Sequence, residues 1–265
     1  MGALAAAAVS LALDGAPAVI ALPLALLAAA LGGAAWGLLP GLLKTAVEAN
    51  EIVTTLMLNV VAVQIYRLVV GHVLNDPTAG FITTPALPDA ATLAPLIPRT
   101  NVTAMAGLAL AATAAAAFLL HRTTLGFAID LVGANPWFAA RAGVAVPRAI
   151  ALSFALGGLF AGLGGFHVSN ALLQRLPIDL TPGIGFDGIV VALLARNRVA
   201  AIPLAALAYA YLRVGAQAME RTTDVPREMV QVIQALIILF VVSDRLWPLA
   251  RQGAAALRQR WGAAS

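Results

Sequence analysis

Hydrophobic residues in this chain come in long, nearly unbroken runs that are separated by short polar stretches. The runs are roughly 15–25 residues long, which is the length of a helix that crosses a lipid bilayer. They lack the every-second-residue alternation of a membrane β-strand. The pattern predicts about seven or eight spans, the first of them partial. They are residues 1–13, 16–38, 52–70, 102–120, 149–166, 184–195, 200–214 and 228–243.

Composition supports a membrane protein. Hydrophobic residues make up 61% of the chain and charged residues 11%, whereas a soluble domain has about 25% charged residues. Backbone groups inside a bilayer must be paired within the protein, so only helices or a closed barrel can span it. We therefore predict an all-α, polytopic transmembrane bundle. The short, glycine- and proline-containing runs within 184–214 are expected to be broken or tilted helices.

Basic residues predict the orientation. If loop 121–148 is cytoplasmic and the spans alternate, ten lysines and arginines lie on the cytoplasmic side and five on the other. The ten are Lys44, Arg122, Arg141, Arg148, Arg196, Arg198, Arg245, Arg251, Arg258 and Arg260. The five are Arg99, Arg175, Arg213, Arg221 and Arg227. The excess places the C-terminus inside and makes loop 71–101 an irregular extracytoplasmic cap.

Loop 121–148 is amphipathic but too polar to span. Asn135 and Pro136 predict the start of a short helix, because proline suits the first helical position. Gly143 predicts its end. A short helix with exposed apolar residues needs a surface to cover it. It either docks into a groove on a partner protein or lies on lipid headgroups, and composition alone leaves both open.

A polar face marks the span that begins near residue 52. Glu51, Thr55 and Asn59 are spaced by four and share one side of a helix. Capping by Asn50, with Glu51 in the first turn, explains Glu51. It does not explain Asn59, which lies two turns deeper and must either bond a neighbouring helix or line a polar cavity.

Asp187 lies within the apolar segment Gly183–Asn197. A carboxylate in a membrane segment normally faces protein or water and marks a pathway. Two roles stay open for it: capping or packing at the start of a broken helix, or direct contact with a solute. The aromatic residue Phe186 lies beside it. In the run 157–165, small residues recur every fourth position, which favours close helix packing.

Several motifs carry a family resemblance. They are Asn50–Asn59, Gly126–Ala128, Val132–Pro136, Ala139–Val144, Gly157–Gly165 and Gly183–Asn197. In this order, across residues 45–243, they resemble the inner-membrane permease subunits of ABC importers for nucleosides and simple sugars. The chain departs from that pattern at two positions. At Asp130 the family usually has a small or basic residue, and at Ala195 it commonly has glycine. Relatives are longer at the N-terminus by two or three spans, so we expect this chain to lack those spans.

The resemblance implies the permease fold of ABC importers, with residues 1–265 as one transmembrane domain. It makes 121–148 the coupling loop that docks on an ATPase, which favours docking over a lipid-bound helix. The residues expected to couple are Gly133, Asn135, Pro136, Ala139, Ala140 and Gly143. The residues expected to line the translocation path are Thr55, Asn59, Phe186 and Asp187.

The expected function is therefore a permease subunit in a bacterial inner membrane, carrying a nucleoside or simple sugar. The chain has no GxxxxGK[ST] phosphate loop, so ATP hydrolysis falls to a separate ATPase. Further implied partners are a second permease, identical or paralogous, and an extracytoplasmic substrate-binding protein. No catalytic residue, metal ligand, cofactor or nucleic acid is expected.

Two other classes remain as alternatives. An ion-coupled secondary transporter needs its own cation or proton site and paired broken helices in inverted repeats, and no second segment matches the one around Asp187. An intramembrane enzyme is weaker still, because neither HExxH nor GxSxG occurs.

Overall fold

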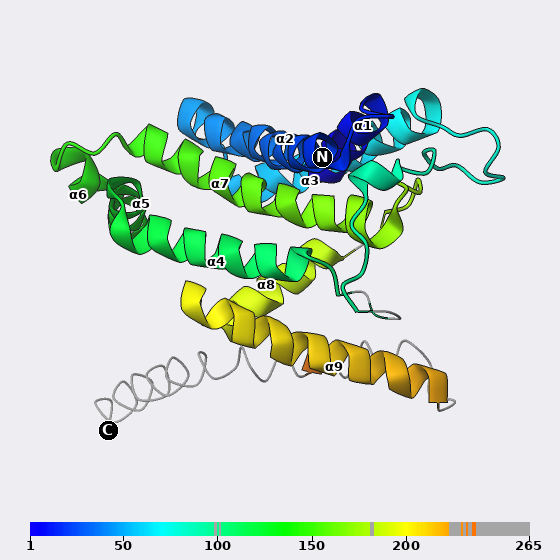
Figure 1. Ribbon diagram of the computed structural model, residues 1–265. Coiled ribbons are helices and arrows are strands. Elements are labelled where there is room, and N and C mark those ends of the chain that lie inside the picture. The colour runs from blue at the N-terminus through cyan, green and yellow to red at the C-terminus, as the bar shows by residue number, and fades with distance from the viewer. Residues whose placement is uncertain are drawn as a thin grey trace, which may run out of the picture. The chain divides into compact units, whose positions relative to one another are not determined.

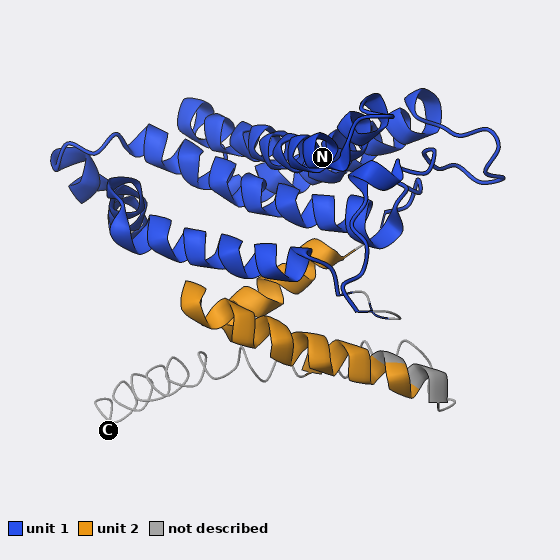
Figure 2. Cartoon of the chain, in the orientation of Figure 1, with its two compact units in different colours: residues 1–182 blue, residues 183–265 orange. Residues whose placement is uncertain are grey.

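The computed structural model describes residues 1–97, 100, 102–180 and 183–222, together with Met229, Val232, Ala235 and Leu236. The chain divides into two compact units, Met1–Pro182 and Gly183–Ser265, which Figure 2 colours separately. The first unit contains α1 (Gly2–Ala12), α2 (Ala18–Val47), α3 (Glu51–Leu68), η1 (Val69–Val73), η2 (Asp89–Ala91), α4 (Met105–Arg122), α5 (Thr124–Ala134), α6 (Pro136–Arg141), α7 (Val146–Phe166) and η3 (His167–Leu173). The second contains α8 (Ile184–Leu194), η4 (Val199–Ala201) and α9 (Ile202–Thr222).

Helices long and apolar enough to cross a membrane confirm the predicted all-α, polytopic bundle. Within the described residues there are five: Ala18–Val47, Glu51–Val73, Met105–Arg122, Val146–Leu173 and Val199–Ala216. Three shorter apolar helices accompany them: α1, α5 and α8. The chain is a multi-pass membrane protein. The span expected at 228–243 falls outside the described residues except for the four positions named above, and the basic C-terminal tail lies wholly outside them.

Three predicted boundaries were wrong. The second span does not end at residue 38 but continues through Pro40 to Val47, because a membrane helix tolerates proline where its neighbours satisfy the freed backbone. The span expected over 200–214 extends to Thr222. The stretch after Arg122 is not loop alone, since α5 begins one residue after its cap Thr123.

The two runs expected over 184–195 and 200–214 are separate helices, as predicted, and neither is broken within its own length. Here α8 ends at Leu194, and the chain turns through Arg196 and Asn197, whose φ angles are 53° and 57°. The backbone then continues through η4 into α9. The short helix α8 and the longer helix α9 therefore form a helical hairpin.

A seam of small residues joins α2 and α7. On α2, Gly33, Gly37 and Gly41 repeat every four residues and face the α7 backbone. A Cβ built on Gly33 would lie 2.3 Å from the carbonyl oxygen of Gly158, and one on Gly162 would lie 2.1 Å from that of Ala29. The two backbones are thus in direct contact, which only glycine permits. This confirms close packing as the role of Gly158, Gly162 and Gly165, whereas Gly157 and Gly164 have no such neighbour.

The irregular segment 71–97 lies at one end of the first unit and the chain between α4 and α7 at the other (Figure 1). Segment 71–97 pairs with the segment after η3, since Thr84 N donates to Leu176 O at 3.1 Å and Leu87 N donates to Gln174 O at 2.9 Å. Tyr66 donates its hydroxyl to Pro177 O at 2.6 Å. The cap is irregular, as predicted, and is held to the helix bundle.

Asn170 is the polar centre of this capped end. Its side chain is fully buried and donates to Ser10 Oγ and to Ala91 O, both at 2.8 Å. It also accepts from Ser169 Oγ at 2.6 Å. One satisfied amide therefore ties α1, η2 and η3 together, as a buried polar group requires.

Candidate functional site

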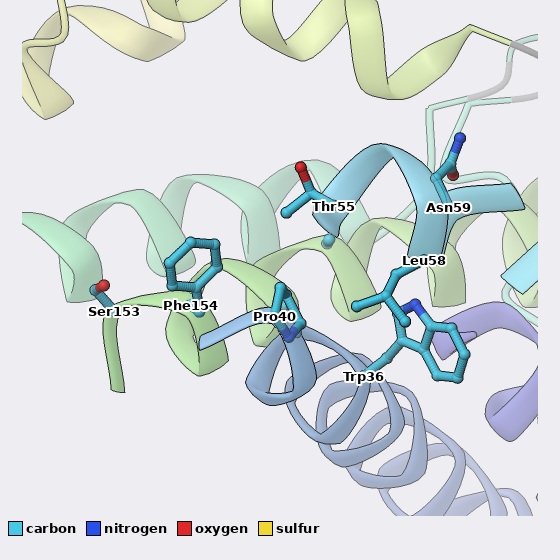
Figure 3. A pocket seen from close by; sticks show the side chains of 11 residues that line it. Trp36, Pro40, Thr55, Leu58, Asn59, Ser153 and Phe154 are labelled. Carbon is cyan, nitrogen blue, oxygen red and sulfur yellow. The ribbon is translucent and has the colours of Figure 1, made fainter. Parts of the chain in front are cut away.

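A groove of about 490 Å³ opens between α2, α3 and α7 of the first unit (Figure 3). Two of the predicted path residues, Thr55 and Asn59, line it from α3. The lining residues are Trp36, Gly37, Pro40, Thr55, Leu58, Asn59, Ser153, Phe154, Gly157, Gly158 and Ala161. None of these residues is charged. Close packing of α2 against α7 forms the floor, and α3 supplies one wall.

The two hydroxyl groups of the groove are available mainly as acceptors. Thr55 Oγ1 donates to Glu51 O at 2.8 Å, and Ser153 Oγ donates to Ile150 O at 2.7 Å. Both hydroxyl protons are thus engaged within their own helices, while the oxygen lone pairs can still accept. The exposed Asn59 amide bonds no other described residue, so it can donate and accept. Of the two alternatives left open for Asn59, the structure shows no bond to a neighbouring described helix and places the residue in the lining of the groove.

The start of α3 is capped as the sequence predicted. Asn50 Oδ1 accepts from Ile52 N at 3.0 Å, and Glu51 lies in the first turn. Glu51 also forms an ion pair with Lys44 near the end of α2, which the sequence did not indicate. The Lys44–Glu51 ion pair and the Asn50 helix cap hold the connection between α2 and α3 in place. Thr55 follows Glu51 by one helical turn, so this connection lies at the edge of the groove.

The short helix α6 is capped at both ends. Asn135 Oδ1 accepts from Phe138 N at 3.1 Å, and Pro136 occupies the first turn. At the other end, Gly143 N donates to Ala140 O at 3.2 Å and Val144 N to Ala139 O at 3.0 Å. These two bonds and the Gly143 φ of 82° form a Schellman cap. The predicted start at Asn135–Pro136 and stop at Gly143 are confirmed.

The predicted coupling residues separate into different roles. Gly133 belongs to α5, whereas the other five lie at Asn135 or beyond it, where α6 begins. Ala139 is buried and holds α6 in place, whereas Ala140 is exposed. Beside them, Trp137 is 79% exposed and Phe138 60%. The exposed surface of α6 therefore combines Trp137, Phe138 and Ala140 with the basic Arg141.

Asp187 and Phe186, the other two predicted path residues, lie in α8 of the second unit. Phe186 is exposed. The Asp187 carboxylate accepts from Tyr209 Oη at 2.7 Å and forms an ion pair with Arg213, both on α9. It thus faces an adjacent helix, one of the two environments predicted for it. An unpaired carboxylate at the centre of a membrane helix costs about 2.5–3.5 kcal/mol on insertion scales.

The sequence analysis missed several residues that the structure brings to these sites. It gave no role to Trp36, Ser153 and Phe154 of the groove, since nothing local marks which helices are neighbours. It counted Arg213 among the basic residues of the non-cytoplasmic side, but this residue lies inside α9. Tyr209 and Arg213 are four residues apart on one helical face, and that spacing was the available signal for a partner of Asp187.

Comparison with known proteins agrees with this architecture. A glucose ABC transporter permease protein of Haloferax volcanii is 36% identical over 249 residues, covering 90% of this chain and 66% of the relative. A guanosine ABC transporter permease protein of Bacillus subtilis is 35% identical, covering 89% of this chain and 68% of the relative. A nucleoside ABC transporter permease protein of Lactococcus lactis is 32% identical, and the match covers 85% of this chain and 64% of the relative.

The chain thus spans about two thirds of the length of these relatives. No solved structure shows significant similarity to it. The family model described as "Branched-chain amino acid transport system / permease component" matches residues 1–242, which include the groove, α6 and the α8–α9 hairpin. With the multi-pass helical architecture and several relatives above 30% identity, this match shows that the chain belongs to that permease family.

Proposed function

We propose that this chain is the transmembrane permease subunit of an ATP-binding-cassette importer and that it forms the path for a nucleoside or simple sugar. The observation that carries the proposal is the uncharged groove between α2, α3 and α7. Thr55 and Asn59 line its polar part, and Trp36 and Phe154 supply aromatic surface. Hydroxyl-rich rings suit such a lining, because their faces pack on aromatic rings while their hydroxyls donate to acceptors.

The absence of charge in the groove separates solute classes. An amino acid carries an ammonium and a carboxylate, and burying either group without a partner is costly. None of the eleven lining residues offers such a partner. An uncharged solute avoids that cost. This favours a nucleoside or sugar over the branched-chain amino acids of the family description, in line with the solutes named for the three relatives.

The energy for transport would come from a separate ATPase that docks on α6. The exposed Trp137 and Phe138 beside Ala140 form a small apolar surface suited to a groove on a partner. A second permease would complete the path, and Haloferax volcanii has two permease proteins of this kind, both similar to this chain. An extracytoplasmic substrate-binding protein would deliver the solute to the opposite end.

Reconstitution tests this function. The permease, its ATPase and a second permease are placed in liposomes with labelled guanosine or glucose and a matching binding protein. We expect uptake that requires ATP and all subunits. The purified chain alone should be inactive under an ion gradient. Ion-driven uptake by the chain alone would instead support a secondary transporter.

The same liposomes test the groove. Asn59→Leu removes the one groove amide that is free to bond a solute, so uptake should fall about tenfold, a loss of ~1.4 kcal/mol, typical of a hydrogen bond. ATP hydrolysis should persist. Val60→Leu, on the neighbouring exposed position of α3 and outside the groove, is the control and should transport normally. Equal uptake by Asn59→Leu and Val60→Leu would remove the groove from the path.

We infer that loop 121–148 and the C-terminus are cytoplasmic, on the strength of the excess of basic residues on that side. The natural chain has no cysteine, so single cysteines report topology directly. In spheroplasts, an impermeant maleimide should label Asp89→Cys in the cap, but neither Ala140→Cys nor Arg258→Cys. Labelling of Arg258→Cys without Asp89→Cys would reverse the orientation.

A further inference from the structure

The second unit contains a charged cluster that the proposed path does not use. Its members are Asp187 on α8 and Tyr209 and Arg213 on α9. Tyr209 Oη donates to one carboxylate oxygen at 2.7 Å, and Arg213 Nη1 pairs with the other. Both carboxylate oxygens are therefore engaged by α9. No side-chain bond caps the start of α8, so the structure does not show helix capping, the other structural role considered for Asp187.

The register of the hairpin explains the contact. Asp187 lies seven residues before the end of α8 at Leu194, and Tyr209 lies seven residues after the start of α9 at Ile202. At 1.5 Å per residue both are about 10 Å from the turn, so they stand level on antiparallel helices. Arg213 is one turn further on the same face, and side chains on a helix lean toward its N-terminus, back to the carboxylate.

Exposure shows which faces meet. On α9 the less exposed positions include Ala205, Tyr209 and Arg213, which recur every fourth residue. On α8, Asp187 and Val191 are less exposed, while Phe186 turns outward. The ion pair thus lies on the face where the two helices meet, with side-chain exposures of 25% for Asp187 and 39% for Arg213.

We propose that Asp187, Tyr209 and Arg213 form an electrostatic clamp that holds α8 in register against α9, with Arg213 as the counter-ion of Asp187. The carboxylate then serves transport by positioning the hairpin and does not bind the solute. Apart from Asp187 and the outward Phe186, α8 consists of glycine and aliphatic residues, which fit many registers. A directional ion pair with a hydroxyl bond selects one of them.

Paired substitutions test the clamp. The variants are Asp187→Asn, Arg213→Gln, the double variant Asp187→Asn/Arg213→Gln and the swap Asp187→Arg/Arg213→Asp. Thermal stability of the purified chain in detergent reports the hairpin without any transport, and ATP-driven uptake is measured beside it. Tyr209→Phe removes one bond to the carboxylate. Tyr211→Phe removes an exposed hydroxyl on the same helix and is its matched control.

Each single charge removal leaves its partner unpaired, so the melting temperature should fall by about 5 °C or more. The double variant and the swap should recover most of that loss, and uptake should recover with them. Tyr209→Phe should lower the melting temperature by a smaller amount and Tyr211→Phe not at all.

Two results would overturn the clamp. In one, Asp187→Asn melts like the natural chain yet loses uptake, which makes the carboxylate a solute ligand. In the other, the double variant and the swap melt no higher than the less stable of Asp187→Asn and Arg213→Gln, which shows that the two charges are not coupled. Because melting is read without transport, either result is distinguishable from failure of the proposed importer function.

Discussion

Gly162→Leu should almost abolish folded protein in the membrane. A Cβ at this position would lie 2.1 Å from the carbonyl oxygen of Ala29 and 3.2 Å from the Cα of Gly33. Both neighbours are backbone atoms of α2, so no side chain can rotate away. Overpacking a core typically costs about 1–3 kcal/mol, and forcing two helix backbones apart should exceed the upper end of that range. Gel filtration of the detergent-extracted chain measures the loss.

Gly164→Leu is the matched control on the same helix. No atom lies within 4 Å of a Cβ built there, so the same substitution meets open space. We expect near-normal amounts of folded chain. Gly158→Leu should behave like Gly162→Leu, since its Cβ would lie 2.3 Å from the Gly33 carbonyl oxygen. Equal yields for Gly162→Leu and Gly164→Leu would contradict the glycine seam.

Trp137→Glu should uncouple ATP hydrolysis from transport while leaving the chain folded. Trp137 is 79% exposed and lies in the first turn of α6, so the change costs the isolated chain little. In a docked complex it would place a charge inside an apolar contact, where an unpaired charge is strongly unfavourable. Uptake in the reconstituted complex should fall at least tenfold, and stimulation of ATPase activity by solute should be lost. Ala140→Glu should act in the same direction.

Trp137→Phe keeps an aromatic anchor at the same place and should retain most of the transport. Phe118→Glu provides a second comparison, because Phe118 is an exposed aromatic residue of α4 that lies outside α6. It is expected to impair membrane insertion and not coupling. Normal transport by Trp137→Glu would remove α6 from the contact with the ATPase.

Local signals in the sequence were enough for several features of this protein. Apolar runs of membrane length predicted the spans, because an isolated bilayer segment must satisfy its own backbone. Asn135, Pro136 and Gly143 predicted both ends of α6, because capping depends only on residues a few positions apart. The same reason explains the correct cap at Asn50 and the break between α8 and α9. The predicted end of α2 at residue 38 was wrong, since the helix continues through Pro40.

The sequence by itself thus determined a helical membrane protein, its short capped helix and an apolar segment with one carboxylate that required a partner. Only the tertiary structure decided which helices are neighbours. It brought Trp36, Asn59 and Phe154 to one groove and set Arg213 against Asp187. The physical reason is that lipid tails are as apolar as the helix surfaces, so hydrophobicity drives insertion but does not choose partners. That choice rests on backbone contact between glycines and on a few polar pairs, which are far apart in the chain.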